Sequence, residues 1–139
     1  MRLVVDTNIL ISALLNRASN AALLLEAWER RRFELVTCED QLDEFARVTR
    51  YPKLRHYLKA ADAGTLKNQL RDVAIYIERL PLVERSPDPE DDWLLALAEV
   101  SAADYLVSGD KRGLLVLGMH GSTRILRLAE MAEVLRLQR

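Results

Sequence analysis

Residues 2–15, RLVVDTNILISALL, contain the change of pattern that decides the fold. Residues 3–5 form an uninterrupted apolar run, which is typical of a strand buried on both faces of a parallel sheet. From Asn8 onward the apolar residues recur at helical spacing instead. Asp6 therefore stands where a buried strand ends and a helix begins.

The rest of the chain repeats this alternation of strand and helix patterns. Further strands are expected at 33–37, within 76–83, at 104–110 and at 123–128, and helices at 21–32, 42–51, 60–76, 91–100 and 129–137. The alternation predicts an α/β fold, a three-layer α/β/α sandwich with a mainly parallel central sheet of four to five strands. Ligands bind such sheets beyond the carboxyl ends of the strands, where the strand order reverses.

Length and composition limit the classes of protein to consider. A chain of 139 residues with a formal net charge of −1 predicts a single domain, 1–139, that does not bind nucleic acid by bulk positive charge. Its one cysteine and two separated histidines exclude a cysteine-rich zinc site and fit a cytoplasmic protein. The longest apolar runs fall short of the roughly 18 residues that span a bilayer, so we expect no membrane partner.

Acidic residues follow the strands and begin the helices that should meet at one edge of the sheet. Asp6 and Asp110 each come directly after an expected strand, and Asp92 begins a helix, with Asp91 as a competitor for that place. Glu44 lies about 110° from the centre of its helix's apolar stripe, at the boundary between core and solvent. Taken alone, Asp6 and Asp110 are equally well explained as turn residues, whereas Asp92 is better explained as a helix cap and Glu44 as a solvated charge; only the four together favour a site.

Carboxylates gathered in one cleft need a cation. Two of them about 5 Å apart repel by roughly 3 kcal/mol at an effective dielectric constant near 20. Hard divalent ions, Mg²⁺ or Mn²⁺, prefer such all-oxygen sites. The chemistry predicted for the cluster is metal-assisted hydrolysis of a phosphodiester.

Three segments of the chain resemble one family. VVDTNILISALL at 4–15, DEFARVTRYPKL at 43–54 and DPEDDWLLALAEVSAADYLVSGDKRGLL at 88–115 are similar to motifs of PIN-domain ribonucleases, and specifically of the compact VapC-like toxins of type II toxin–antitoxin pairs. The spacing of the last two acids, 110 − 92 = 18, favours Asp92 over Asp91 as the third acid. Ser108 stands where a threonine is common in the family.

The resemblance implies a function and partners. It implies a magnesium- or manganese-dependent endoribonuclease that acts on RNA, forms a homodimer and has a small antitoxin protein as its partner. It assigns the metal ligands and catalytic acids to Asp6, Glu44, Asp92 and Asp110. Asn8 and Ser108 are expected to orient water or a carboxylate, with Asp91 in a supporting position.

Basic residues that flank two of these acids in the sequence are candidates for contact with RNA phosphates. They are Arg50, Lys53, Arg55, Lys111 and Arg112. Tyr51 and Tyr57 could stack on bases or, alternatively, cover the core. No role is expected for the histidines, because the nucleophile is a metal-bound water.

Two other classes of function compete with this hypothesis. An aspartyl-phosphate receiver or phosphatase-like α/β domain also carries Asp at strand ends, but it requires a further acid beside the first, and Thr7 and Asn8 are not acidic. A non-catalytic or weakly catalytic RNA- or protein-binding module of the same fold is the other alternative. The presence of all four acids counts against it.

Overall fold

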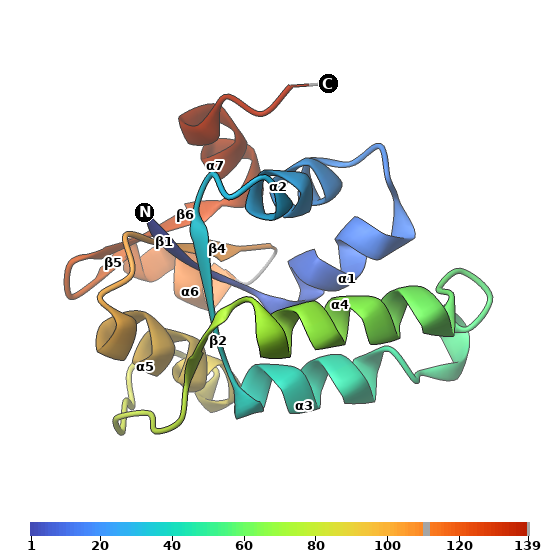
Figure 1. Cartoon of the computed structure of the whole chain (residues 1–139). Coiled ribbons are helices and arrows are strands. Elements are labelled where there is room, and N and C mark those ends of the chain that lie inside the picture. Colours follow the sequence, from blue (N-terminus) through green and yellow to red (C-terminus); the bar gives the residue numbers. More distant parts are fainter. Residues whose placement is uncertain (110–111, 139) are drawn as a thin grey trace.

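The computed structural model describes residues 1–109 and 112–138. Within these residues a six-stranded sheet forms the centre of the molecule (Figure 1). The strand order is β3-β2-β1-β4-β6-β5. The strands are β1 (Arg2–Val5), β2 (Glu34–Cys38), β3 (Ile75–Ile77), β4 (Tyr105–Ser108), β5 (Met119–His120) and β6 (Thr123–Arg127). All neighbouring strands are parallel except the β5–β6 pair. The predicted α/β class with a mainly parallel sheet is confirmed.

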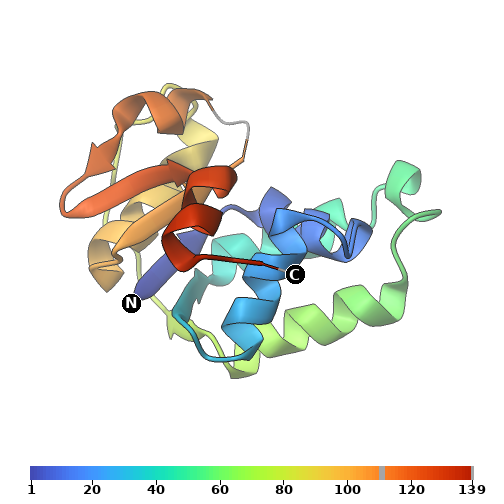
Figure 2. The same cartoon turned by 90° about the horizontal axis from the view of Figure 1, so that it is seen from above.

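Helices cover both faces of the sheet. They are α1 (Thr7–Leu15), α2 (Asn20–Glu29), α3 (Glu39–Val48), α4 (Ala60–Asp72), α5 (Asp92–Ser101), α6 (Arg112–Leu117) and α7 (Leu128–Leu135), with 3₁₀ turns η1 (Pro52–Leu54) and η2 (Pro89–Asp91). Helices α1, α2, α3, α4 and α7 share a core with Val5 and Val107, whereas α5 and α6 share the opposite core with Val4 and Leu106. The alternation of side chains along each strand thus produces three layers (Figure 2).

The strand order reverses between β1 and β4. The chain passes from β1 outward to β2 and β3, and then places β4 on the other side of β1. Asp6 directly follows β1, and Ser108 is the last residue of β4. Both residues therefore lie at the position where open parallel sheets bind ligands.

The structure corrects several expected boundaries. Helix α4 ends at Asp72 rather than near residue 76, because the chain from Ile75 pairs with β2. Strand β3 is only three residues long, and the chain beyond it is irregular as far as η2. Helix α6 and strand β5 were not expected, and β5 raises the number of strands from the predicted four or five to six.

Helix α6 and strand β5 are difficult to predict from the sequence because glycines lie within or beside them. Gly113 lies within α6, and a Cβ there would approach Pro87 to 3.2 Å, so the helix packs closely on the loop that precedes α5. Gly118, with a φ of 69°, joins α6 to β5, and Gly121, with a φ of 57°, lies in the tight turn between β5 and β6. The close approach and the turn are tertiary features that residue periodicity does not reveal.

Helices α1 and α2 are the most apolar helices at the N-terminal end of the chain. Neither of them, nor any other helix in the described ranges, is by itself long and apolar enough to cross a membrane. The two pass that test only together, as a pair bent by 101°. Both bury residues in the protein core, for example Leu10 and Leu24.

Candidate active site

Asp6 is fixed at the reversal point by its own backbone and by helix α1. Its amide donates a hydrogen bond to the carbonyl oxygen of Val107 at 2.9 Å, which ties it to the end of β4. Its Oδ1 accepts from the amide of Asn8 at 3.2 Å, so Asp6 is the N-cap of α1. The residue is 1% exposed. Asp6 is thus the cap of α1 and also lies at the predicted functional edge, so these two interpretations of the residue are compatible.

A buried amide joins the end of β1 to helix α3. Gln41, which is fully buried, donates from Nε2 to the carbonyl oxygen of Val5 at 2.6 Å. Its Oε1 accepts from the Thr37 hydroxyl at 2.7 Å. These two bonds fix the peptide that precedes Asp6 against the helix that carries Glu44. Gln41 was not predicted from the sequence, although a polar residue on the apolar side of α3 was a visible signal.

Two buried hydroxyl groups lie at the same strand ends. Thr7 Oγ1 and Ser108 Oγ are inaccessible to solvent and have no hydrogen-bond partner among the described residues. Buried polar atoms are nearly always satisfied by protein, water or an ion. These hydroxyls and the Asp6 carboxylate offer oxygen atoms, which fits the ligand preference of Mg²⁺ or Mn²⁺.

Glu44 lies on α3, three residues after Gln41 and therefore on a neighbouring side of the helix. Its side chain is 21% exposed, and Oε2 lies 3.9 Å from a guanidinium nitrogen of Arg47. The expected position at the boundary between core and solvent is the one observed. A carboxylate there keeps contact with solvent while its backbone is held by the Gln41 connection.

Asp91 and Asp92 occupy different environments at the start of α5. Asp92 Oδ1 accepts from the amides of Arg85 at 3.2 Å and Ser86 at 2.7 Å, and so holds the preceding loop. Asp91 is 6% exposed. It lies three, four and seven residues before Leu94, Leu95 and Ala98, which are fully buried between α5 and the sheet, and so it shares their face of the helix.

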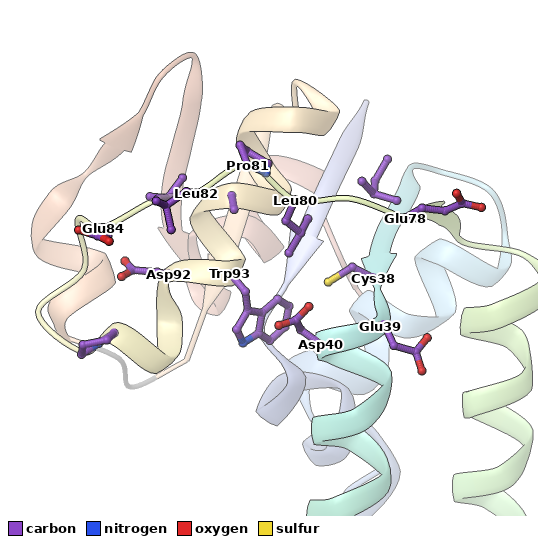
Figure 3. A pocket seen from close by; sticks show the side chains of 14 residues that line it. Cys38, Glu39, Asp40, Glu78, Leu80, Pro81, Leu82, Glu84, Asp92 and Trp93 are labelled. Atoms are coloured by element: carbon purple, nitrogen blue, oxygen red, sulfur yellow. The ribbon is translucent and has the colours of Figure 1, made fainter.

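A groove with an acidic rim lies beyond the ends of β2 and β3. We call it the acidic groove; its volume is about 450 Å³, and five carboxylates line it: Glu39, Asp40, Glu78, Glu84 and Asp92. No basic side chain is among the described residues that line it. Figure 3 shows Asp92 pointing toward the loop that carries Glu84, and Trp93 reaching toward Asp40 at the start of α3. A hydrogen bond to Glu39 at 2.9 Å raises the pKa of the neighbouring Tyr76 phenol.

A second groove lies on the other side of Asp6, beyond the ends of β4 and β6. We call it the Arg127 groove; its volume is about 760 Å³. Polar residues from four elements and their connections line it: Asn8, Ser12, Ser108, Arg112 and Arg127. Ile9, Leu115 and Leu128 supply apolar surface. Among the described residues its lining contains no carboxylate.

The remaining predicted residues are distributed unevenly. Asp110 and Lys111 lie outside the described residues, and within those residues no group of three or more His, Cys, Asp or Glu side chains is arranged to hold a metal.

Arg112 lines the Arg127 groove with Asn8 and Ser108. Arg50, Lys53 and Arg55 instead follow the far end of α3, at the turn toward α4 (Figure 1). Tyr51 and Tyr57 are there too, 38% and 74% exposed, so neither covers the core fully.

Cys38 and His120 contribute to the packing and hydrogen bonding of the fold. Burial raises the pKa of the Cys38 thiol to about 11, which keeps it protonated and unreactive near neutral pH. His120 Nδ1 lies 2.9 Å from an Arg85 guanidinium nitrogen, and Nε2 lies 3.0 Å from Glu99 Oε1. Since arginine can only donate, Nδ1 accepts and Nε2 donates. His120 thus connects the β5–β6 hairpin to α5 and to the loop before it.

Comparison of the sequence with protein families identifies a match that covers most of the chain. Residues 2–112, which include both strands of the reversal point and helix α5, match the model described as PIN domain. No curated protein matches the chain at a significant level.

Proposed function

Because this chain belongs to the PIN domain family, whose members are generally metal-dependent nucleases, we propose that it is a Mg²⁺- or Mn²⁺-dependent endoribonuclease. The observation that carries the proposal is the placement of Asp6 at the reversal of strand order, beside the buried hydroxyl of Ser108. Open parallel sheets place ligands at that point. The carboxylate of Asp6 and the hydroxyls of Thr7 and Ser108 suit a hard cation better than zinc, which proteins bind mainly by thiolate and imidazole.

The residues of the site have separate roles in this proposal. Asp6, Glu44 and Asp110 hold the metal together with one acid at the start of α5. An ion held by these residues would supply a nucleophilic water at neutral pH and would neutralise charge on the scissile phosphate. Asn8 and Ser108 orient groups around Asp6, and the hydrogen bond from Gln41 to Val5 fixes the backbone on which that carboxylate stands.

For the acid on α5 we assign the metal-facing role to Asp91 and the loop-holding role to Asp92. Asp92 already accepts two backbone amides and lines the acidic groove. Asp91 is 6% exposed and lies three and four residues before the fully buried Leu94 and Leu95, on the same face of the helix. The 18-residue spacing to Asp110 supports Asp92 instead, so the two predictions are in direct competition.

Cleavage of RNA by the purified chain tests the nuclease proposal. Total RNA incubated with the protein and Mn²⁺ should give discrete fragments, and EDTA should prevent their formation. The Asp6→Asn protein, which retains a side-chain oxygen for the N-cap, should give none. Well-folded protein whose fragments are absent, or identical with those of Asp6→Asn, would sink the proposal.

The finer proposal is that the chain is the toxin of a type II toxin–antitoxin pair in the cytoplasm. It is supported by the resemblance of the three segments at 4–15, 43–54 and 88–115 to VapC-like toxins. Induced expression should then stop growth and produce new RNA ends in the cell, and Asp6→Asn should do neither. Growth arrest by both proteins alike, without RNA cleavage, would point to a non-catalytic binding module.

A further inference from the structure

Three strand ends lie side by side at the edge of the sheet that carries Asp6. Val5 is the register partner of Val107, so Asp6 is adjacent to Ser108, and Ser108 is in turn the register partner of Arg127. Adjacent strands are about 4.8 Å apart, which places the Cα atom of Arg127 roughly 10 Å from that of Asp6. An extended arginine side chain can therefore approach a group bound next to Asp6.

The Arg127 groove begins at this row of residues and carries positive charge. Arg112 and Arg127 line it from α6 and from the end of β6, and neither forms an ion pair within the described part of the chain. Ser108, whose buried hydroxyl has no hydrogen-bond partner among the described residues, lines the same groove. Two guanidinium groups in one groove, with no carboxylate among the described residues that line it, fit an anionic ligand.

The acidic groove on the other side of Asp6 has the opposite character. Its five carboxylates repel a polyanion; Arg71, which is not part of the lining, lies 3.9 Å from Glu39 and offsets that one charge. The two grooves follow the same sheet edge, one beyond β2 and β3 and the other beyond β4 and β6. A nucleic acid strand that places a phosphate at Asp6 is therefore directed away from the acidic groove.

We propose that the Arg127 groove holds the RNA strand on one side of the scissile phosphate, with Arg127 as a substrate-binding residue. Arg112 and Arg127 bind flanking phosphates, and Ile9, Leu115 and Leu128 give apolar contact for a base or ribose. The proposal deepens the proposed function and rests on it for the position of the scissile bond. It adds Arg127, which was not among the residues predicted from the sequence, to those that contact substrate.

Equilibrium binding of a short fluorescein-labelled oligouridylate in EDTA tests this proposal without cleavage. Arg127→Gln should raise the Kd about five- to tenfold at low salt and reduce the slope of log K against log salt by about 0.7, as expected for one lost phosphate contact on a single strand. Arg124→Gln is the matched control, because Arg124 is an exposed arginine at the opposite end of the same strand. It should leave Kd and slope unchanged, and Arg127→Lys should restore the slope.

The outcomes separate this proposal from the nuclease proposal. Equal effects of Arg127→Gln and Arg124→Gln, or no binding of oligouridylate by the wild-type protein, would overturn the groove assignment even if Mn²⁺-dependent cleavage is observed. Binding that depends on Arg127 without any cleavage would overturn the nuclease proposal and leave the groove assignment standing. Should Arg127→Gln fail to fold, Arg112→Gln, which changes the other arginine that lines the groove, carries the same expectation.

Discussion

The side-chain amide of Gln41 lies 2.6 Å from the carbonyl oxygen of Val5, the residue directly before Asp6. Thr37, at the neighbouring end of β2, donates to the same amide at 2.7 Å. One buried side chain thus ties β1, β2 and α3 together. Because α3 also carries Glu44, the relative position of two proposed metal ligands depends on this connection.

Gln41→Leu should therefore damage the site as well as the fold. The change leaves the Val5 carbonyl and the Thr37 hydroxyl without these partners, and we expect a loss of about 2–4 kcal/mol in the free energy of unfolding. We also expect weaker Mn²⁺ binding at temperatures where the variant is fully folded. Gln69→Leu, a partly buried glutamine on α4, is the control for the substitution itself. A Gln41→Leu protein with wild-type stability and metal affinity would show that the connection is dispensable.

Asn substitutions at the start of α5 decide between its two acids. An asparagine at 92 still accepts the amides of Arg85 and Ser86, so Asp92→Asn should retain most RNA cleavage. Asp91→Asn should lower the cleavage rate at least a hundredfold while the protein stays folded. Asp92→Ala, which removes the acceptor, should cost about 1–3 kcal/mol of stability. Loss of activity in Asp92→Asn alone would restore the assignment based on the 18-residue spacing.

The buried thiol of Cys38 makes stability depend on pH in the alkaline range. Its pKa is raised from 9.0 to about 11 in the folded protein, because burial disfavours the thiolate. The resulting stability is fully present below pH 9 and is lost as the pH rises toward 11, since the unfolded chain loses the proton first. The loss amounts to about 3 kcal/mol at most. Urea unfolding at several pH values should show a steeper alkaline decline in wild type than in Cys38→Ala; parallel declines would argue against a buried, protonated thiol.

His120 should stabilise the loop between β3 and α5. It accepts from Arg85 and donates to Glu99, and His120→Ala removes both bonds. We expect a loss of about 1–3 kcal/mol and faster limited proteolysis within residues 78–88. Tyr57→Ala, which changes an exposed ring on another part of the surface, is the control. Unchanged proteolysis in His120→Ala would mean that this loop is held by other contacts.

The sequence predicts the layers and the ends of the main strands because burial of both sheet faces leaves a local pattern. Residues 3–5 and the segment YLVS at 105–108 are continuous apolar or small runs, and the polar residue after β1 stands where the chain turns into a helix. Asp6 could therefore be assigned to the functional edge from the sequence alone.

Features that depend on partners distant in the chain were not predictable in this way. Gln41 has its role only because Val5, 36 residues earlier, lies beside it. Arg127 reaches the edge through its register with Ser108, and Asp92 differs from Asp91 in its contacts with the loop at 85–86 and in its burial. Local periodicity places a residue on a face, whereas tertiary pairing decides which polar group that residue meets.

Calorimetric titration with Mn²⁺ tests the central claim most directly, because it does not depend on knowing which RNA is cleaved. Folded wild-type protein should bind Mn²⁺, and Asp6→Asn should bind it at least ten times more weakly. Glu133→Gln, an exposed acid on α7, should behave as wild type. A wild-type protein that binds no Mn²⁺, or an Asp6→Asn protein that binds it equally well, would contradict the metal centre at the junction of β1 and β4.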